Sequence, residues 1–295
     1  MTRTKVGLVG TGYWARQVHA AALAVHPDLE FVGIWGRDRE RADEAGAPHG
    51  VPGYDDFDAL LAEVDVLAFA VPPSVQSELA VRAAEAGKHL FLEKPIALDL
   101  ASADRLVAAV DERGLSTVVF FTSRFVPVWE NWLDSIAAAG VLGGRADWLS
   151  SQTGKDNPYV GSAWRRENGA LWDVGPHQLA QLIPALGPVV DIAGARGVGD
   201  LVHLILTHEG GATSRMSLGQ GMPKSAVRFA VEFYGEDGWS SQPEDPRDVG
   251  KAYARAVDEL LANIAAGETA HRCGVHFARD VVEVITRCEA VLGRR

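Results

Sequence analysis

A lysine comes directly after an apolar run in the segment KHLFLEKPIALDL, residues 88–100. The run HLFL has the pattern of a strand buried on both faces, and Glu93, Lys94 and Pro95 follow it at once. The carboxyl ends of strands in a parallel sheet face the ligand crevice. Lys94 at such an end can hydrogen-bond a substrate oxygen and lower the pKa of a neighbouring hydroxyl or base. The alternative is a solvent-facing charge that ends the strand.

A glycine-rich loop, GTGYWA at residues 10–15, follows the first predicted strand. Gly10 permits a tight turn, Gly12 lets the backbone approach a pyrophosphate, and Ala15 allows close helix packing. The loop opens a helix and begins a run of βα units, as the dinucleotide-binding fingerprint requires. The predicted cofactor contacts are Gly10, Thr11, Gly12, Tyr13, Trp14, Ala15, Gly36, Arg37, Pro72, Glu93 and Lys94. A tight turn without a ligand is the alternative, and packing alone also explains Tyr13 and Trp14.

The residues after the second predicted strand favour NADP over NAD. Where an NAD site usually carries Asp or Glu, this chain has Gly36, followed by Arg37. A guanidinium can pair bidentately with a 2′-phosphate, and Gly36 presents no carboxylate to repel it. Two alternatives stay open. Arg37 can belong to the solvated first turn of a surface helix, or the strand can end two residues later and bring Asp38 to the ribose hydroxyls.

The chain resembles the Gfo/Idh/MocA oxidoreductases, the group of glucose-fructose oxidoreductase and inositol dehydrogenase. Three segments carry the resemblance: GTGYWA, AVPPSVQSELAVRAAEAGKHLFLEKPIALD and NGALWDVGPH. It covers the N-terminal half closely and the C-terminal half mainly through the last motif. The resemblance implies that Lys94 binds substrate and takes part in catalysis. It also places Asp173 and His177 at positions used for substrate orientation and acid–base catalysis.

Histidine suits such a role, because an unperturbed pKa of about 6.5 lets it accept a proton near neutrality as hydride leaves the same carbon. Asp173 and His177 are four residues apart and can share a face if this segment is helical. Pro176 restricts that helix to begin no earlier than about Asp173. His177 alone would be explained as well by a structural role.

Trp164 and Arg165, in the aromatic and basic segment YVGSAWRRE, are candidates for lining the substrate pocket, and a surface loop explains them equally well.

Two positions depart from the family. Ala180 stands where a second Asp is common, and Gln76 stands where many members carry His. These departures are compatible with the same hydride-transfer chemistry, but the substrate stays unidentified. The remaining histidines, including His19, His89 and His276, are interpreted as structural.

Apolar strands alternate with helical patterns through the first 120 residues. Strands are predicted at residues 5–10, 31–35, 65–71, 89–93 and 116–121. This rhythm predicts a doubly wound α/β Rossmann domain with a parallel sheet over residues 1–120.

After Phe121 the rhythm changes, and residues 121–295 predict an α+β domain for substrate binding and oligomerisation. Its expected parts are a helix at 126–139, a mostly antiparallel open sheet, and helices over 249–292 that break near 266–274. The sheet would come from residues 145–152, 190–198, 201–220, with EGG as a hairpin turn, and 227–235.

Composition narrows the class of protein. The 295 residues include 39 acidic and 28 basic side chains, a net charge of −11, so nucleic acid and anionic membranes are poor partners. The two cysteines, without a C-x-x-C or ligand-spaced histidines, suggest neither a disulfide framework nor a metal site, and they fit a cytoplasmic protein. We see no signal segment and no apolar run of about 20 residues.

The sequence therefore predicts an NADP-dependent oxidoreductase that moves hydride to or from a sugar, polyol or related small molecule. An NAD-dependent glycosidase of the same family and a non-catalytic nucleotide-sensing protein are the alternatives. Because relatives often pair through the open face of the second sheet, we also expect a homodimer or homotetramer.

Overall fold

The computed structural model describes residues 3–152, 158–159 and 161–293. The chain divides into two compact units, one formed by Met1–Phe120 with Asp248–Arg279 and the other by Phe121–Arg247 with Asp280–Arg295. The first unit thus includes Asp248–Arg279, a segment that the sequence analysis assigned to the second domain. A functional boundary at residue 120 stays a prediction.

The first unit is built on a six-stranded sheet in which every strand pair is parallel. The strands are β1 (Thr4–Val9), β2 (Leu29–Trp35), β3 (Gly53–Tyr54), β4 (Val66–Phe69), β5 (His89–Leu92) and β6 (Thr117–Val119). Their order, β3-β2-β1-β4-β5-β6, reverses direction between β1 and β4, and ligands of such sheets bind at that switch point. The predicted doubly wound α/β fold is confirmed.

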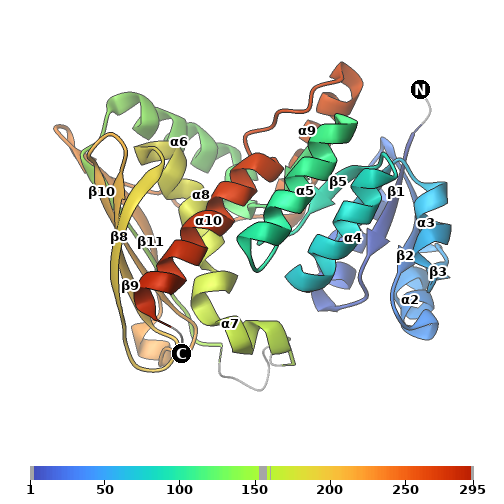
Figure 1. Cartoon of the computed structure of the whole chain (residues 1–295), viewed down its shortest axis with the longest axis horizontal. Helices are drawn as coiled ribbons and strands as arrows, with labels where there is room; N and C mark the ends of the chain where they lie inside the picture. Colours follow the sequence, from blue (N-terminus) through green and yellow to red (C-terminus); the bar gives the residue numbers. More distant parts are fainter. Residues whose placement is uncertain (1–2, 153–157, 160, 294–295) are drawn as a thin grey trace. The chain divides into compact units, whose positions relative to one another are not determined.

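Helices connect these strands (Figure 1). They are η1 (Ala15–Ala20), α1 (Ala21–Val25), α2 (Arg39–Gly46), η2 (Ala47–His49), α3 (Phe57–Glu63), α4 (Pro73–Glu85) and α5 (Leu100–Arg113), with α9 (Val249–Ala266) added from the later segment. Asp38, Asp56 and Asp99 begin α2, α3 and α5, because each carboxylate accepts a first-turn backbone N–H.

The second unit is built on a six-stranded sheet of order β12-β11-β7-β10-β9-β8. Its strands are β7 (Gly143–Leu149), β8 (Val189–Arg196), β9 (Val202–His208), β10 (Thr213–Gly219), β11 (Arg228–Gly235) and β12 (Gly238–Ser241). All pairs are antiparallel except β7 with β10. The predicted, mostly antiparallel second sheet is confirmed. Gly211, with φ +86°, lies in the turn between β9 and β10.

Helices cover one face of this sheet: η3 (Thr122–Phe125), α6 (Pro127–Ala139), α7 (Ala163–Asp173), α8 (Gly175–Leu186) and the later part of α10 (Val275–Leu292). A 3-10 turn, η4 (Lys224–Ala226), precedes β11. Strand β9 alternates as expected for a half-covered sheet, with Leu204 and Leu206 buried and Ile205 55% exposed between them. Within the described ranges, no helix has the length and apolarity needed to cross a bilayer.

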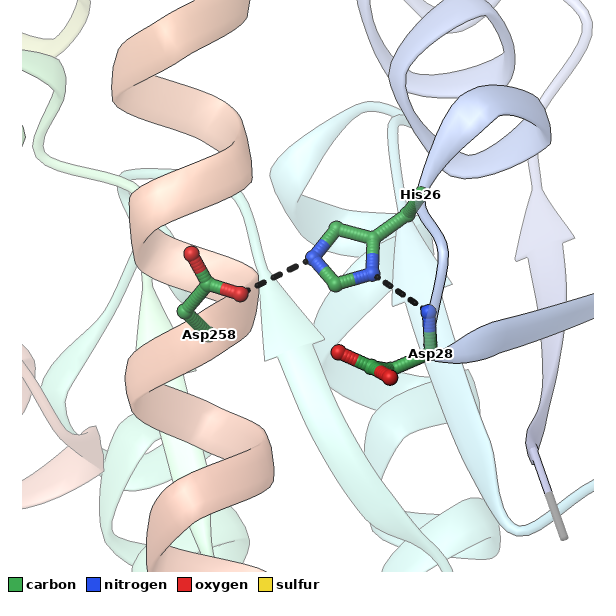
Figure 2. A group of neighbouring side chains, drawn as sticks. All are labelled: His26, Asp28 and Asp258. Atoms are coloured by element: carbon green, nitrogen blue, oxygen red, sulfur yellow. Dashed lines mark hydrogen bonds and ion pairs between the residues drawn. The ribbon is translucent and has the colours of Figure 1, made fainter. Parts of the chain in front are cut away.

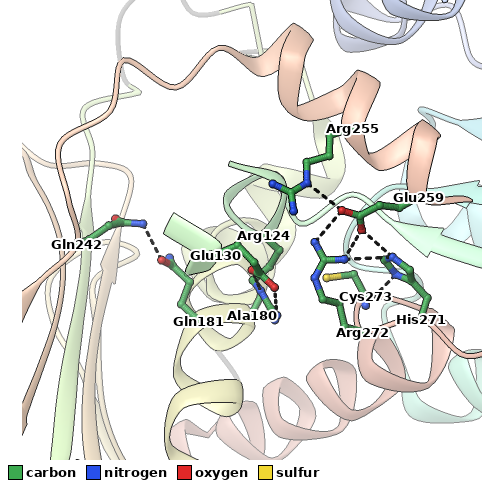
Figure 3. Close-up of polar contacts among 10 residues, drawn as sticks. All are labelled: Arg124, Glu130, Ala180, Gln181, Gln242, Arg255, Glu259, His271, Arg272 and Cys273. Carbon is green, nitrogen blue, oxygen red and sulfur yellow. Dashed lines mark hydrogen bonds and ion pairs between the residues drawn. The ribbon is translucent and has the colours of Figure 1, made fainter. Parts of the chain in front are cut away.

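A buried ion pair joins three helices of the second unit. The Arg124 guanidinium in η3 donates two hydrogen bonds to the Glu130 carboxylate of α6, at 2.7 and 2.8 Å, and a third to the backbone oxygen of Ala180 in α8, at 3.1 Å (Figure 3). Both charged side chains are at most 7% exposed. The pair therefore anchors the first turns of α8, where His177 lies.

A second polar cluster fixes the end of α9 in the first unit. Glu259 accepts hydrogen bonds from Arg255, Arg272 and His271, the last two being in the loop after the helix (Figure 3). Burial raises the pKa of Glu259, but the hydrogen bonds from His271 and Arg272 outweigh it and bring the pKa to about 2. The carboxylate is therefore charged at neutral pH and holds the loop.

Candidate active site

The glycine-rich loop between β1 and η1 has the geometry that a dinucleotide needs. Gly10 has φ +133°, and a Cβ there would lie 2.4 Å from the backbone oxygen of Ala70, so no other residue fits. A Cβ on Gly12 would meet no atom within 4 Å, which leaves the backbone open to a phosphate. Ala15 is fully buried where η1 begins. The loop fits the pyrophosphate of NAD(P).

The cofactor loop is hydrogen-bonded to the segment that carries Lys94. The Trp14 indole N–H donates to the Glu93 carboxylate at 2.7 Å, and Glu93 follows β5 directly. The buried His19 Nε2 lies 3.0 Å from the same carboxylate oxygen, and the Lys94 backbone N–H donates to the other oxygen at 3.3 Å. Glu93 thus binds three N–H groups and holds the two segments together.

Tyr253 of α9 extends this network. Its hydroxyl lies 3.0 Å from Nδ1 of His19. Burial, and then the charge of Glu93, raise the pKa of Tyr253 well above its ordinary value. The hydroxyl therefore stays protonated and donates to Nδ1, so Nε2 of His19 carries the ring proton and donates to Glu93. His19, interpreted as structural from sequence, positions the carboxylate beside Lys94.

Gln76 fixes the same segment from the other side. The buried Gln76 amide of α4 donates to the backbone oxygen of Glu93 at 2.7 Å and accepts from the Glu93 backbone N–H at 2.9 Å. It also donates to the backbone oxygen of Pro95 at 3.3 Å. The glutamine that replaces the family's histidine therefore sets the backbone from which Lys94, half-buried, projects.

Strand β2 ends at Trp35, so Gly36 and Arg37 take the places predicted for them. A Cβ on Gly36 would lie 2.6 Å from Cγ2 of Thr11, because this turn packs on the cofactor loop. Asp38 is the N-cap of α2 and accepts the Arg41 backbone N–H at 3.2 Å. Among the described residues, the exposed Arg37 side chain has no hydrogen-bond or ion-pair partner, whereas Arg39 pairs with Asp43.

Three other predicted cofactor residues lie on the surface of the same unit. Thr11 is half-buried and its backbone oxygen accepts from the Arg16 guanidinium at 3.0 Å. Tyr13 is 51% exposed. Pro72, the exposed N-cap of α4, follows shortly after β4. Contact with a cofactor stays a prediction for all three.

Asp173 and His177 lie in different helices, so the condition for one common helical face, a single helix through both residues, is not met. Asp173 is the last residue of α7, and His177 lies in the first turn of α8, which begins at Gly175 with Pro176 next. Val174, with φ −110° and ψ −18°, separates the two helices. Proline is tolerated only in the first turn of a helix, so Pro176 is compatible with a helix that begins at Gly175. The sequence restricted the start of the helix in the same way.

Asp173 is buried and held by two donors. The Arg165 guanidinium donates to its carboxylate at 3.1 Å, and the Gln220 side-chain amide donates to the same oxygen at 2.7 Å. Arg165 also lies 4.4 Å from the Tyr159 ring centroid and 4.7 Å from that of Trp164. Arg165 and Trp164 therefore belong to α7, not to an irregular loop, and Arg165 orients Asp173. Sequence reasoning missed Gln220, because no motif marks it.

His177 stacks on Trp148 of β7, with ring centroids 5.4 Å apart and planes 14° from parallel. The stack fixes the orientation of the imidazole, and both residues line a cavity of about 340 Å³ in the second unit. Ala180, one turn further along α8, is fully buried, so the family's second Asp has no counterpart at that position. Trp148 is a site residue that sequence reasoning missed.

His26, Asp28 and Asp258 form a small cluster in the first unit (Figure 2). The Asp28 backbone N–H donates to Nδ1 of His26 at 3.3 Å, and Nε2 lies 3.1 Å from the Asp258 carboxylate. Because Nδ1 accepts a hydrogen bond, Nε2 carries the proton and donates to Asp258. Neither nitrogen offers a lone pair to a metal, and the cluster instead joins the end of α1 to α9.

Residues 4–121 match the family model described as an oxidoreductase family with an NAD-binding Rossmann fold, GFO_IDH_MocA. Residues 4–121 therefore belong to the Gfo/Idh/MocA family. The recognition made from GTGYWA and the Glu93-Lys94-Pro95 segment is confirmed.

The similarity to relatives extends into the second unit. An uncharacterised oxidoreductase of Synechocystis is 31% identical over 199 residues, 64% of this chain and 53% of that protein. The chain therefore matches about half of that relative's length. A dTDP-3,4-didehydro-2,6-dideoxy-alpha-D-glucose 3-reductase of Streptomyces antibioticus is 26% identical over 80% of this chain and 74% of its own.

Among solved structures, a levoglucosan dehydrogenase in complex with NADH and L-sorbose superposes with a TM-score of 0.83. The match covers 98% of this chain and 97% of that one at 18% identity, and it shows a shared fold.

Proposed function

We propose that the protein is an NAD(P)-dependent oxidoreductase that moves hydride between nicotinamide C4 and a carbinol or carbonyl carbon of a sugar, polyol or related small molecule. The observation that carries this proposal is the Trp14–Glu93 hydrogen bond of 2.7 Å. It joins the dinucleotide loop to the Lys94 segment at the carboxyl edge of one sheet, the edge where such folds bind their ligands. A protein that only bound a nucleotide would not need Lys94 beside that loop.

The proposed roles follow from the chemistry of each side chain. Bound nicotinamide would supply the hydride acceptor or donor. Lys94 would hydrogen-bond the reacting oxygen and lower the pKa of that hydroxyl. His177, held against Trp148, would take the hydroxyl proton during oxidation and return it during reduction. Asp173, fixed by Arg165 and Gln220, would orient the substrate.

A sugar-like substrate is supported by the relatives. The Streptomyces antibioticus relative is named as a reductase of a dideoxy-glucose derivative. The levoglucosan dehydrogenase with the same fold binds L-sorbose. A small-molecule partner and a cytoplasmic location remain part of the proposal.

The experiment that tests this function is a panel of sugars, polyols and diols, screened with both NAD and NADP for reduction of the nicotinamide. We expect net turnover with free cofactor for at least one compound. Cleavage of a glycoside without net reduction would favour a glycosidase that recycles its cofactor. Tight cofactor binding without either activity would favour a nucleotide sensor.

NADP is the proposed preferred cofactor. Three observations support this choice: β2 ends at Trp35, Asp38 caps α2, and the Arg37 side chain has no partner among the described residues. Arg37 can give the 2′-phosphate a charge-assisted bidentate pair. NADH in the levoglucosan dehydrogenase is a property of that protein, and its 18% identity carries no cofactor preference to this chain.

Replacing Arg37 with Ala should weaken NADP binding by roughly 10- to 150-fold, because a charge-assisted pair contributes about 1.5–3 kcal/mol. NAD binding should change little. Arg39→Ala is the matched control, because Arg39 already pairs with Asp43 at 2.9 Å. Calorimetric titration of both cofactors measures the effect. A wild-type protein that binds NAD more tightly than NADP would contradict this assignment.

A homodimer or homotetramer through the open face of the second sheet is also proposed. That face exposes Ile205 and Trp239, 55% and 62% exposed, beside ion pairs such as Arg228–Asp147. Self-complementary patches of this mixed kind suit a two-fold interface. Analytical ultracentrifugation at micromolar concentration should show an oligomer. A single monomeric species would refute the prediction.

A further inference from the structure

The cavity beside His177 differs in charge from the rest of this acidic protein. Its volume is about 340 Å³, and its ionisable lining residues are His177 and Arg247. Among the described residues, no aspartate or glutamate lines it. A second cavity of the same unit, of about 250 Å³, has three carboxylates, Glu167, Asp200 and Glu289, and one arginine, Arg196, among its lining residues. The contrast is notable in a chain of net charge −11, and it favours an anionic occupant for the first cavity.

Arg247 is held in an unusual backbone conformation. With φ +40°, it is the one non-glycine residue of the described chain with positive φ. Strained residues of this kind persist where the surrounding structure fixes them, and they concentrate at binding sites. Its backbone N–H donates to Asp245, while its exposed side chain has no hydrogen-bond or ion-pair partner in the described ranges. The guanidinium is therefore available to a ligand.

The segment that carries Arg247 is fixed at its beginning. The Gln242 side chain donates to Gln181 of α8 at 2.8 Å, and its backbone N–H donates to Val231 of β11 at 2.9 Å (Figure 3). The Trp129 indole donates to the backbone oxygen of Pro243 at 2.8 Å. Arg247 thus occupies a defined position at the cavity.

The remaining walls suit a small ring that bears hydroxyl groups. Phe229 packs edge-on against Trp148, with ring centroids 5.3 Å apart, and provides an apolar platform. Three buried polar atoms of lining residues have no hydrogen-bond partner among the described residues: Ser123 Oγ, Trp148 Nε1 and Gln178 Oε1. A ligand or an ordered water is the usual partner of such atoms.

We propose that the substrate is an anionic monosaccharide or polyol whose carboxylate or phosphate binds Arg247. The cavity is at the small end of the roughly 300–1,000 Å³ range of ligand pockets, so it suits a single sugar ring. That the hydroxyl at His177 is the one oxidised rests on the proposed function. The anion site itself rests on the charge and geometry of the cavity.

The test is calorimetric titration of D-glucose, D-glucuronate and D-glucose 6-phosphate, and of the matching galactose series. NADPH is present so that no probe is oxidised. Wild type, Arg247→Gln, Arg247→Lys and a control, Arg105→Gln, are compared. Arg105 lies on α5, where its guanidinium contacts only Ser102 among the described residues, so the control removes one positive charge that does not line the cavity.

An anionic probe should bind the wild type at least about 10-fold more tightly than its neutral sugar. Arg247→Gln should abolish this difference, Arg247→Lys should keep part of it, and Arg105→Gln should retain it all. If glucuronate binds more tightly than glucose 6-phosphate, the substrate carries a carboxylate. If glucose 6-phosphate binds more tightly, the substrate carries a phosphate.

Equal binding of neutral and anionic probes, or no binding of any anionic probe at millimolar concentration, would overturn the proposal. So would an Arg247→Gln variant that loses NADPH affinity while its sugar binding is unchanged. Because binding needs no turnover, the two proposals fail separately. Anion binding without oxidation of any compound refutes the proposed reaction alone, and oxidation of neutral sugars that ignores Arg247 refutes the anion site alone.

Discussion

Replacing His177 with Ala should lower kcat by roughly 100-fold or more, and replacing Lys94 with Ala should do the same, while cofactor affinity should change little. The reason is that each side chain is assigned a proton or a hydrogen bond that matters most in the transition state. His276→Ala and Lys251→Ala are matched controls, since both residues are exposed, at 63% and 87%, and within the described ranges each pairs only with a surface carboxylate. Steady-state kinetics on the substrate found in the panel measures the effect.

The double variant Lys94→Ala/His177→Ala adds a sharper test. Residues that act in one chemical step show non-additive losses, so the double variant should lose much less than the product of the two single effects. Raising the pH should restore part of the activity of His177→Ala, since hydroxide can replace a missing base. Near-normal kcat in either single variant would remove that residue from the mechanism.

Glu130→Ala should destabilise the second unit by about 3–5 kcal/mol, because it leaves the Arg124 guanidinium buried without its charge partner. The two side chains are 5% and 7% exposed, so water cannot replace the lost carboxylate. Urea unfolding followed by tryptophan fluorescence measures the change, since Trp129 and Trp132 lie on the same helix as Glu130.

Glu44→Ala is the matched control. It also removes a helical glutamate from an ion pair with arginine, but that carboxylate is 60% exposed, and the loss should be at most about 1 kcal/mol. Replacing both buried partners, Arg124→Met with Glu130→Leu, should recover most of the stability. A Glu130→Ala loss no larger than that of Glu44→Ala would show that the buried pair does not stabilise α6 and α8.

The parts of the fold that sequence predicted are those with strong local signals. The strands of the first sheet carry continuous apolar runs, and segments with helical periodicity separate them. Gly10 was predictable for the same reason, since a tight turn after the first strand demands positive φ. The short strands β3 and β12, of 2 and 4 residues, give no periodic pattern and were missed.

The candidate site was only partly predictable, because the residues that hold its side chains in position come from distant segments of the chain. Glu93 is held by Trp14 and His19, 79 and 74 residues away in sequence, and His19 by Tyr253, 234 residues away. Such contacts leave no local signature, so His19 looked merely structural. Spacing alone was compatible with one helix for Asp173 and His177, whereas a new helix begins at Gly175, with Pro176 in its first turn.

The most direct measurement of the proposed reaction follows an isotope. The protein is incubated with NADP and substrates of the panel deuterated at their carbinol carbons, and the nicotinamide is analysed by mass spectrometry. Direct hydride transfer predicts a reduced cofactor that carries one deuterium, together with an oxidised substrate. A protein that binds the cofactor but reduces none of it with any compound, or yields reduced cofactor without deuterium, would contradict the proposed function.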